Sequence, residues 1–363
     1  MYNRILIAPD KFKGSLTASR FCDIARETLK EIFPCAETVC KPLADGGEGS
    51  LDCFVTATGA TTVNGSYTGP DGTPVDATFA LAGDTAFIEM SQTAGLALTK
   101  IRNPLYTTTY GVGEQIAHAV SEGAKKIFLA IGGSATNDAG CGLAAALGWK
   151  FLDEEGREFV PTGGTLCKIK NIKPPEKPLG AEVTTLCDVT NPLFGKNGAA
   201  HVYAAQKGAT ESEIEELDRN TVHFNEICKT QGQDLSQIAG GGAAGGLGAG
   251  SVFFLGAKLK GGAESFFALT DIKKEISVCD LIITGEGKID RQTLHGKTVG
   301  ALYAASQGKG FVAFCGKKEG EVPFECVEIN REGLTLEDNL KNTPENLRAA
   351  LQKRLCRIDC PTV

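Results

Sequence analysis

Residues 4–33, RILIAPDKFKGSLTASRFCDIARETLKEIF, determine the fold class that the sequence predicts. The short apolar run Ile5–Ala8 is typical of a buried strand in a parallel sheet, and a polar loop follows it. From Leu16 to Phe33 the apolar spacing changes to that of one helical face, for which Thr17 is a suitable N-cap. The face consists of Phe21, Ile24, Ala25, Leu29 and Ile32. The stretch therefore predicts a strand, a loop and a helix, the repeating unit of α/β proteins.

Further apolar runs and periodic stretches extend this pattern along the chain. Residues 126–131, 281–284 and 311–314 each predict another buried strand. Between Thr61 and Met90 the apolar residues alternate with period two, and turn signals occur at 69–74 and 82–84. This segment therefore predicts an antiparallel meander. Helical periodicity is present at 113–123, 141–150, 211–231 and 336–355, the last with Leu340, Leu347, Leu351 and Leu355 on one face.

The order of these segments predicts two domains, which the length of 363 residues also supports. Strand–helix units occur at the start of the chain and again after Asp280, and the meander lies between them. We therefore predict an α/β protein in which residues 1–65 plus 265–363 form one discontinuous domain with a parallel sheet. Residues 66–264 are predicted to form a second, mixed α/β domain inserted into the first.

The composition excludes several classes of function. Lys and Arg number 37 against 44 Asp and Glu, and no basic block is present, so neither nucleic acid nor an anionic membrane is an expected partner. The thirteen cysteines lack CxxC or zinc-type spacing, which predicts reduced thiols in a cytosolic protein. The first residues lack the apolar core of a signal peptide, and no segment approaches the roughly 18 apolar residues of a membrane span. These features predict a cytoplasmic location.

Glycine is unusually frequent, at 45 of 363 residues, and it concentrates beside charged and hydroxyl residues in six loops. A glycine lets backbone N–H groups approach an anion closely, and a helix N-terminus behind it adds a favourable dipole. Phosphate is therefore the expected ligand class for several of these loops. They are APDKFKGS (8–15), ADGGEGS (44–50), RNPLYTTTYGVG (102–113), IGGSATNDAGCG (131–142), CDVTNPLFG (187–195) and TGEGKIDRQTLHGK (284–297).

Each loop also has an ordinary structural interpretation. IGGSATNDAG can be a tight turn in which Asn137 or Asp138 caps the next helix, and Asp188 can form an Asx turn. Two nucleotide motifs are absent, because Arg291 stands where a Walker A loop needs glycine and no convincing strand precedes the GxGxxG of residues 240–245. We expect that glycine tract to serve close helix packing or a hinge. The four histidines have no spacing typical of a metal site or triad, and no GxSxG motif supports acyl transfer.

Together the loops contain the groups that phosphoryl transfer requires. Such a site needs N–H groups around phosphates, cations, carboxylates for Mg²⁺ and one group that orients the acceptor hydroxyl. The candidate cations are Lys11, Lys13, Arg102, Lys207, Lys288 and Arg291, and the candidate carboxylates are Asp10, Asp45, Asp188 and Asp290. Cations beside glycine loops in an otherwise acidic protein are consistent with a small anionic ligand.

Ten motifs, in order from residue 8 to residue 293, resemble those of the type I glycerate kinases. They are APDKFKGSLTA, ADGGEGS, GPDGTPV, IEMSQTAGL, RNPLYTTTYGVGE, IGGSATNDAGCG, CDVTNPLFG, QKGA, GGGAAGGLGAG and TGEGKIDRQT. The resemblance implies ATP-dependent phosphorylation of D-glycerate with Mg²⁺, most often to 2-phosphoglycerate. It also implies a Rossmann-like or flavodoxin-like domain interrupted by a second α/β domain, with the active site in the interdomain cleft. The chain departs from the family at Lys11, where a serine is expected, and at Cys315–Lys318, where a Gly-Ser turn is common.

The resemblance and the chemistry of each ligand suggest roles for individual residues. The carboxylate of glycerate favours a bidentate cation and its hydroxyls favour polar partners, and the residues assigned to them are Lys13, Ser15, Arg102 and Asn103. The ATP phosphates are assigned to Gly132, Gly133, Ser134, Thr136, Gly285, Gly287 and Lys288. Asp188 is the predicted catalytic base, with Asp45 as second choice, and the candidates for Mg²⁺ are Asp290 and Asp138.

Other functions agree less well with the sequence. Another small hydroxy acid, or the 3-hydroxyl of D-glycerate, is an alternative acceptor for the phosphate. Two α/β domains around a cleft also describe solute-binding proteins, but the start of the chain and the abundance of cysteine argue against that class. A dehydrogenase is disfavoured because no glycine fingerprint lies between a strand and a helix with an acidic residue about 20 positions on.

Overall fold

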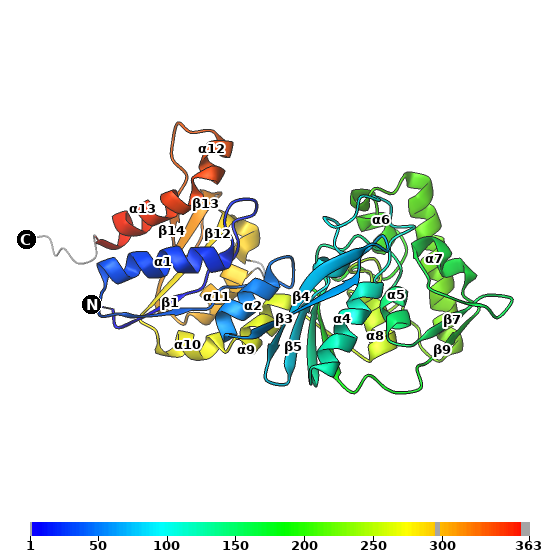
Figure 1. Cartoon of the computed structure of the whole chain (residues 1–363). Helices are drawn as coiled ribbons and strands as arrows, with labels where there is room; N and C mark the ends of the chain where they lie inside the picture. Colours follow the sequence, from blue (N-terminus) through cyan, green and yellow to red (C-terminus); the bar gives the residue numbers. More distant parts are fainter. Residues whose placement is uncertain (1, 295–297, 357–363) are drawn as a thin grey trace, which may run out of the picture. The chain divides into compact units, whose positions relative to one another are not determined.

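The computed structural model describes residues 2–294 and 298–356, which form two compact units (Figure 1). Unit 1 contains the residues up to Asp45, Asp52–Gly59 and the residues from Ala263 onward, and unit 2 contains Gly46–Leu51 and Ala60–Gly262. The boundaries expected from the sequence were residues 65 and 265, and the assignment of the short segment Gly46–Leu51 to unit 2 was not anticipated. Each unit has its own sheet and hydrophobic core.

Unit 1 is built on a parallel sheet of five strands in the order β14-β13-β12-β1-β2. The strands are β1 (Arg4–Ile7), β2 (Glu37–Cys40), β12 (Leu281–Ile289), β13 (Gly310–Lys318) and β14 (Glu325–Glu328). Ile5 pairs with Leu281 on one side and with Thr38 on the other, so β1 lies inside the sheet. The buried strands predicted at 5–8, 281–284 and 311–314 are confirmed.

Helices cover both faces of this sheet. They are α1 (Ala18–Ile32), α2 (Ser50–Thr58), α9 (Gly262–Leu269), α10 (Ile272–Val278), α11 (Thr298–Ala305), α12 (Leu336–Lys341) and α13 (Thr343–Leu355), with a 3₁₀ turn at Arg291–Leu294. Because successive strand residues point to opposite faces, Ile5 and Ile7 pack with α1 and α13, whereas Leu6 packs with α10 and α11. Helices α1 and α13 lie side by side (Figure 1).

The first helix agrees closely with its prediction, and the last does not. Thr17 caps α1 by accepting a hydrogen bond from Arg20 N at 3.2 Å. The single helix predicted for residues 336–355 is wrong, because the chain breaks at Asn342 into α12 and α13 and proline occupies the first turn of α13. Leu340, before the break, is 37% exposed, whereas the three leucines after it are fully buried.

Unit 2 is built on a mixed sheet in the order β11-β10-β6-β5-β4-β3. The predicted meander is confirmed as β3 (Thr61–Thr68), β4 (Pro74–Ala82) and β5 (Thr85–Glu89), which are antiparallel. Strands β6 (Lys126–Ala130), β10 (Glu182–Leu186) and β11 (Lys258–Lys260) continue the sheet parallel to β5. The strand predicted at 126–131 is thereby confirmed.

Helices of different lengths and a small second sheet complete unit 2. The helices are α3 (Ser91–Ala94), α4 (Tyr110–Ser121), α5 (Cys141–Ala146), α6 (Ala199–Tyr203), α7 (Glu211–Thr230) and α8 (Leu247–Leu255), with 3₁₀ turns at Gly163–Lys168 and Ala205–Lys207. The small antiparallel sheet contains β7 (Lys150–Leu152), β8 (Glu158–Phe159) and β9 (Asn171–Lys173). Helix α5 is shorter than the predicted 141–150, because Gly148 takes a left-handed conformation (φ +90°) and the chain enters β7.

The glycine tract at 240–250 brings α8 into close contact with the loop before α5. A Cβ atom at Gly250 would lie 2.0 Å from the carbonyl oxygen of Ala139. A Cβ atom at Gly245, whose φ is +67°, would lie 1.9 Å from the carbonyl oxygen of Thr136. Only glycine permits these backbone contacts, so the structure supports the packing role expected for the tract.

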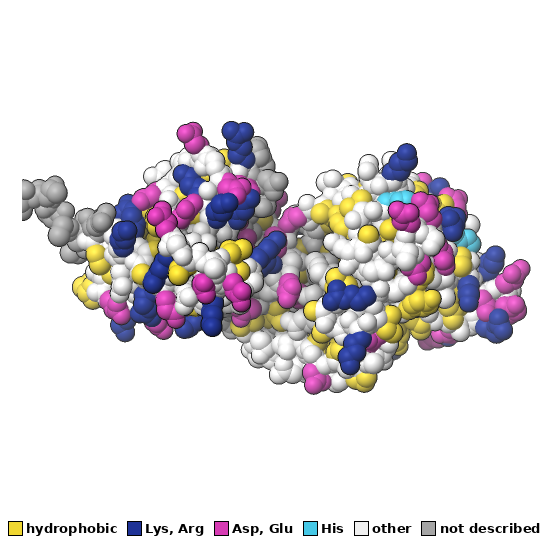
Figure 2. All heavy atoms as spheres, turned by 90° about the horizontal axis from the view of Figure 1, so that it is seen from above, with side chains coloured by type: hydrophobic (Ala, Val, Ile, Leu, Met, Phe, Trp, Pro, Cys, Tyr) yellow, Lys and Arg dark blue, Asp and Glu magenta, His cyan; other side chains and the backbone are white. Residues whose placement is uncertain are grey.

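The surface of each unit carries both signs of charge. On the face shown in Figure 2, basic and acidic side chains are interspersed over each unit. Within residues 2–294 and 298–356, no helix has both the length and the apolar character needed to cross a membrane.

Candidate functional site

Three parallel strands of unit 2 end side by side, and their loops begin at the same edge. Glu89 of β5 is in register with Ala130 of β6, which is in register with Leu186 of β10. Ligands of open α/β sheets bind beyond the carboxyl ends of the strands. The predicted loops 131–142 and 187–195 follow β6 and β10, and they therefore lie where a ligand is expected.

The loop segment Gly46–Leu51 is attached to the same edge by a buried carboxylate. Glu89, which is 3% exposed, accepts hydrogen bonds from Gly49 N (3.1 Å) and Leu51 N (3.0 Å). Gly132 N donates to the carbonyl oxygen of Gly46 at 3.2 Å, and a Cβ at Gly132 would lie 2.7 Å from the Cα of Gly47. The structure therefore brings three of the six predicted loops together. Sequence reasoning missed Glu89, although this residue lies in the motif IEMSQTAGL, because no role was assigned to that motif.

The glycine loop after β6 presents part of its backbone to solvent and buries the rest. Gly133 is exposed with φ +78°, and its carbonyl oxygen accepts a hydrogen bond from Leu96 N at 3.0 Å. Ser134 is 8% exposed, whereas Thr136 is completely buried. Of the residues assigned to the ATP phosphates in this loop, Gly132 and Gly133 are thus the more accessible, and Thr136 lies in the interior of unit 2.

Asp138 is an internal hydrogen-bond acceptor. It is fully buried, and its carboxylate accepts bonds from Thr109 N, Thr109 Oγ1, Gly140 N and Gly142 N at 2.7–3.2 Å. Burial raises the pKa of this carboxyl group, while the N–H and hydroxyl donors oppose that shift. Gly142 lies in the first turn of α5, so Asp138 holds the helix start, as one interpretation of the sequence expected. Four donors around one carboxylate favour this structural role over Mg²⁺ binding.

Lys207, one of the candidate cations, also lies in the interior. Its side chain is 2% exposed, and Nζ donates a hydrogen bond to the carbonyl oxygen of Thr136 at 2.7 Å. Burial lowers the pKa of this amine to about 7, and the negative charge of Asp138 partly offsets that effect. The exposed cation of the candidate set in unit 2 is Arg102.

Asp188 is held at the edge formed by β10 but remains exposed. Its Oδ1 accepts a hydrogen bond from Gly262 N, the first residue of α9, at 2.6 Å. This bond orients the carboxylate without burying it. A carboxylate that is fixed and accessible has the geometry needed to accept a proton from a substrate hydroxyl.

Arg102 and Asn103 differ in how their side chains are used. Arg102 is exposed, and its backbone packs closely against Gly208 (φ +99°), where a Cβ atom would lie 2.0 Å from the Arg102 carbonyl oxygen. Asn103 donates to Glu213 Oε1 at 2.6 Å and accepts from Leu105 N at 2.9 Å. The Arg102 guanidinium therefore suits an anionic ligand, while the Asn103 amide shapes the loop.

In the loop 102–113, the hydroxyls of Thr107 and Thr109 serve the interior of unit 2. Thr107 donates to the carbonyl oxygen of Ala135 at 2.8 Å, and Thr109 binds Asp138. Both threonines are fully buried. These side chains support the glycine loop from behind.

The remaining candidates of the loop 8–15 lie in unit 1. Lys13 is exposed, and the hydroxyl of Ser15 donates to the carbonyl oxygen of Phe12 at 3.3 Å. Asp10, which follows β1, is a partly buried carboxylate that accepts hydrogen bonds from Lys11 N and from the hydroxyl of Thr298. Burial raises the pKa of Asp10, and the nearby Asp45, which is itself exposed, adds to that shift.

Gly285, Gly287 and Lys288, expected in a phosphate-binding loop, are part of strand β12. Gly285 is in register with Phe314 of β13, and its carbonyl oxygen accepts the N–H of Asp10 at 2.7 Å. Lys288 pairs with Glu319 at 2.7 Å and with Asp290 at 3.5 Å. The expectation of a loop here is wrong, because β12 extends five residues beyond the predicted Thr284. Residues 295–297 of the motif lie outside the described residues.

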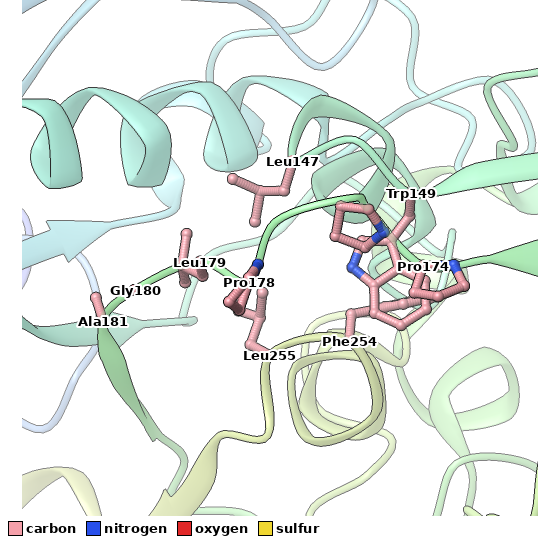
Figure 3. A pocket seen from close by; sticks show the side chains of 10 residues that line it. Leu147, Trp149, Pro174, Pro178, Leu179, Gly180, Ala181, Phe254 and Leu255 are labelled. Carbon is pink, nitrogen blue, oxygen red and sulfur yellow. The ribbon is translucent and has the colours of Figure 1, made fainter.

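A pocket of about 440 Å³ in unit 2 has a different chemical character (Figure 3). Its lining is mainly apolar and includes Trp149, Leu147, Phe254 and prolines of the segment 174–178. It contains none of the residues assigned above to substrate, phosphate, metal or proton transfer. A phosphate site needs N–H donors and cations, so the carboxyl edge of the unit 2 sheet is the stronger candidate.

Comparisons with known proteins agree over the whole chain. The family model for the glycerate kinase family matches residues 5–358. The chain is 44% identical over 304 residues to a glycerate 2-kinase of Escherichia coli (strain K12), covering 81% of this chain and 79% of that protein. It is also 44% identical over 355 residues to a glycerate kinase of Bacillus cereus, covering 96% and 93% of the two chains. A crystal structure described as "putative glycerate kinase 2 from Salmonella typhimurium LT2" has a TM-score of 0.88 and 37% identity, and covers 99% of this chain and 98% of that one.

Two α/β units with glycine loops at sheet edges are compatible with a phosphate-binding protein, and the comparisons identify which family it is. The chain belongs to the glycerate kinase family. It is accordingly a kinase that transfers phosphate to an alcohol group, with ATP as co-substrate.

Proposed function

We propose that this protein transfers the γ-phosphate of ATP to D-glycerate and forms 2-phosphoglycerate. The observation that carries the proposal is the match over most of the chain to proteins named glycerate 2-kinase and glycerate kinase. The carboxyl edge of the unit 2 sheet supports it, because glycine loops and an oriented carboxylate occur there, and the exposed Arg102 belongs to the same unit.

Within unit 2 we assign complementary roles to three groups. The N–H groups of Gly133 and Ser134, which follow the Gly132 N–H that is bonded to Gly46, approach the phosphates, where fixed donors stabilise the charge of the transition state. Arg102 binds the carboxylate of glycerate, for which a guanidinium offers bidentate geometry. Asp188 accepts the proton of the attacking hydroxyl. The hydrogen bond from Gly262 N to Asp188 Oδ1 orients the carboxylate for that role.

In unit 1 the assignments concern the edge formed by the ends of β1 and β12. Lys13 and Ser15 are proposed to contact glycerate, and Asp45 is the second candidate for the base. Lys288, although it is in a strand, remains exposed and can attract nucleotide phosphates once its pairing with Glu319 is broken.

Mg²⁺ is part of the proposal, and Asp290 fits the ion better than Asp138 does. Mg²⁺ takes one or two carboxylates and completes its shell with phosphate oxygens and water, where it neutralises developing charge on the transferred group. Asp290 is partly exposed, and Lys288 Nζ lies 3.5 Å from its Oδ2. Asp138 is enclosed by four donors, so the proposal places the ion at Asp290. Among the described residues, no group of three or more His, Cys, Asp or Glu could hold a metal, and Mg²⁺ bound mainly through nucleotide needs none.

The direct test is incubation with D-glycerate, ATP and Mg²⁺, followed by ³¹P NMR of the product. We expect the resonance of 2-phosphoglycerate. The 3-phosphate would change the proposed position of transfer, and phosphorylation of other hydroxy acids in preference to D-glycerate would contradict the substrate.

Removal of divalent metal is expected to reduce turnover to below about 1%, because Mg²⁺ contributes several kcal/mol of charge stabilisation. The measurement is initial rate in EDTA, with rate restored by titration with excess Mg²⁺. Undiminished turnover of desalted protein in EDTA would remove Mg²⁺ from the proposal.

Arg102→Ala is expected to raise the KM for D-glycerate about tenfold with a smaller change in kcat, because one charge-assisted contact to the bound carboxylate is lost. Steady-state kinetics at saturating ATP measure both constants. Arg219→Ala, which removes a cation from α7 in the same unit, is the matched control. An unchanged KM for glycerate in Arg102→Ala would exclude this arginine from the carboxylate site.

A further inference from the structure

The interior of unit 2 directly behind the glycine loop contains polar groups that the proposed chemistry does not use. Thr136 Oγ1 and both polar atoms of the Asn137 side chain are buried and have no hydrogen-bond partner among the described residues. Both residues are completely inaccessible to solvent. Buried polar atoms are almost always paired, so unpaired ones in a glycine loop point to a segment shaped for function rather than for stability.

The segment 135–138 is held by contacts from other parts of unit 2. Ala135 N donates to the carbonyl oxygen of Ala94 at 2.8 Å, and the carbonyl oxygen of Ala135 accepts the Thr107 hydroxyl at 2.8 Å. At the next residue, the carbonyl oxygen of Thr136 accepts Lys207 Nζ at 2.7 Å. The side chains of Thr136 and Asn137 contribute no hydrogen bond of their own, so the Lys207 amine is the side-chain donor that holds the carbonyl group of Thr136.

The placement of Lys207 is costly, which argues that it has a purpose. A lysine is rarely buried completely, because its ammonium loses hydration. Lys207 ends a 3₁₀ turn, and Gly208 after it takes φ +99° and packs against the backbone of Arg102. The same turn therefore packs against the backbone of Arg102 through Gly208 and donates a hydrogen bond to that of Thr136 through Lys207.

We propose that Lys207 is a positioning residue, whose buried amine holds the backbone at Thr136 so that the N–H groups of Gly133 and Ser134 face the phosphates of ATP. The inference rests on the proposed function, which assigns those N–H groups to ATP. In this role Lys207 does not contact the substrate, because it lies on the buried side of the loop 131–142.

The test compares the full-length wild type with Lys207→Met, which keeps the length of the side chain and removes the donor, and with Lys207→Arg, which keeps donor and charge. Lys170→Met removes an exposed lysine of the same unit and is the matched control. Trp149 is the single tryptophan of the chain, and its ring centroid lies 5.1 Å from that of Phe254. The fluorescence emission of Trp149 therefore reports whether unit 2 is folded. ATP affinity is measured by calorimetry without glycerate, and turnover by a coupled assay.

We expect folded Lys207→Met to bind ATP about tenfold more weakly, the factor typical for loss of one buried hydrogen bond from a charged donor. The KM for ATP should rise in parallel, and hydrogen exchange should accelerate at residues 132–138 but not in the meander. Lys207→Arg should bind within about threefold of wild type, and Lys170→Met should be unchanged.

The remaining outcomes separate this inference from the proposed function. A folded Lys207→Met with wild-type ATP affinity and unaltered exchange overturns the positioning role. If Lys207→Met does not fold, Lys207→Arg decides, and a folded Arg variant with tenfold weaker ATP binding overturns it. If the wild type binds ATP but does not phosphorylate glycerate, only the proposed substrate is contradicted. Weakened ATP binding in Lys207→Met would then still support the positioning role of Lys207. Wild type that does not bind ATP overturns both.

Discussion

Asp188→Asn is expected to reduce kcat for phosphoryl transfer about 1,000-fold, within the range that general-base catalysis contributes. The substitution preserves the size of the side chain and an oxygen that can accept the N–H of Gly262, so the local geometry is retained. What it removes is the negative charge and basicity that accept the proton of the attacking hydroxyl. Initial rates at saturating ATP and D-glycerate measure the effect.

The matched control for this change is Asp76→Asn, which neutralises an exposed carboxylate of strand β4 in the same unit. Its kcat should equal that of wild type. If Asp188→Asn keeps more than about a tenth of wild-type kcat, Asp188 is not the base. Asp45→Asn then becomes the next variant to measure, since Asp45 is the second candidate.

Gly250→Ala is expected to destabilise unit 2 by about 3 kcal/mol, the upper part of the range for an overpacked interior. The added Cβ would lie 2.0 Å from the carbonyl oxygen of Ala139, a backbone atom that cannot move without displacing the start of α5 or α8. Urea unfolding followed by Trp149 emission measures the shift, because Trp149 reports on unit 2.

Gly256→Ala separates this steric effect from the general cost of replacing glycine. Gly256 ends the same helix with φ +60°, and a Cβ there meets no heavy atom within 4 Å. Only the left-handed conformation is penalised, by about 1 kcal/mol. Equal destabilisation by the two variants would show that close packing at Gly250 does not matter.

Elements determined by nearby residues were predicted well, whereas elements that depend on distant parts of the chain were not. Helix α1 was predicted well because its apolar face and its cap Thr17 are encoded within one stretch. The helix predicted at 336–355 was wrong because the leucine period continues across Asn342, while the backbone breaks there. Strand β12 was predicted too short because Gly285 and Gly287 suggested a loop, and pairing with β13 overrides that local preference.

The candidate site shows the same division. The glycine loop after β6 and the carboxylate after β10 could be found from the sequence, since each follows an apolar run and precedes a turn. Residue type alone could not distinguish the residues that bind a ligand from those that hold the loops in place. Asp188 and Asp138 are both aspartates after a strand, yet one is exposed and the other is enclosed by four donors.

The sequence by itself determined the α/β class, the interrupted order of the strand–helix units and the resemblance to the glycerate kinases, because periodicity, turn residues and motifs are local properties. Only the tertiary structure decided which polar groups are accessible and which support the loops from behind. Glu89 binds Leu51 from 38 residues away, Lys207 binds Thr136 across 71 residues, and Asp188 binds Gly262 across 74. Such partners are selected by the packing of whole elements, so no local pattern contains them.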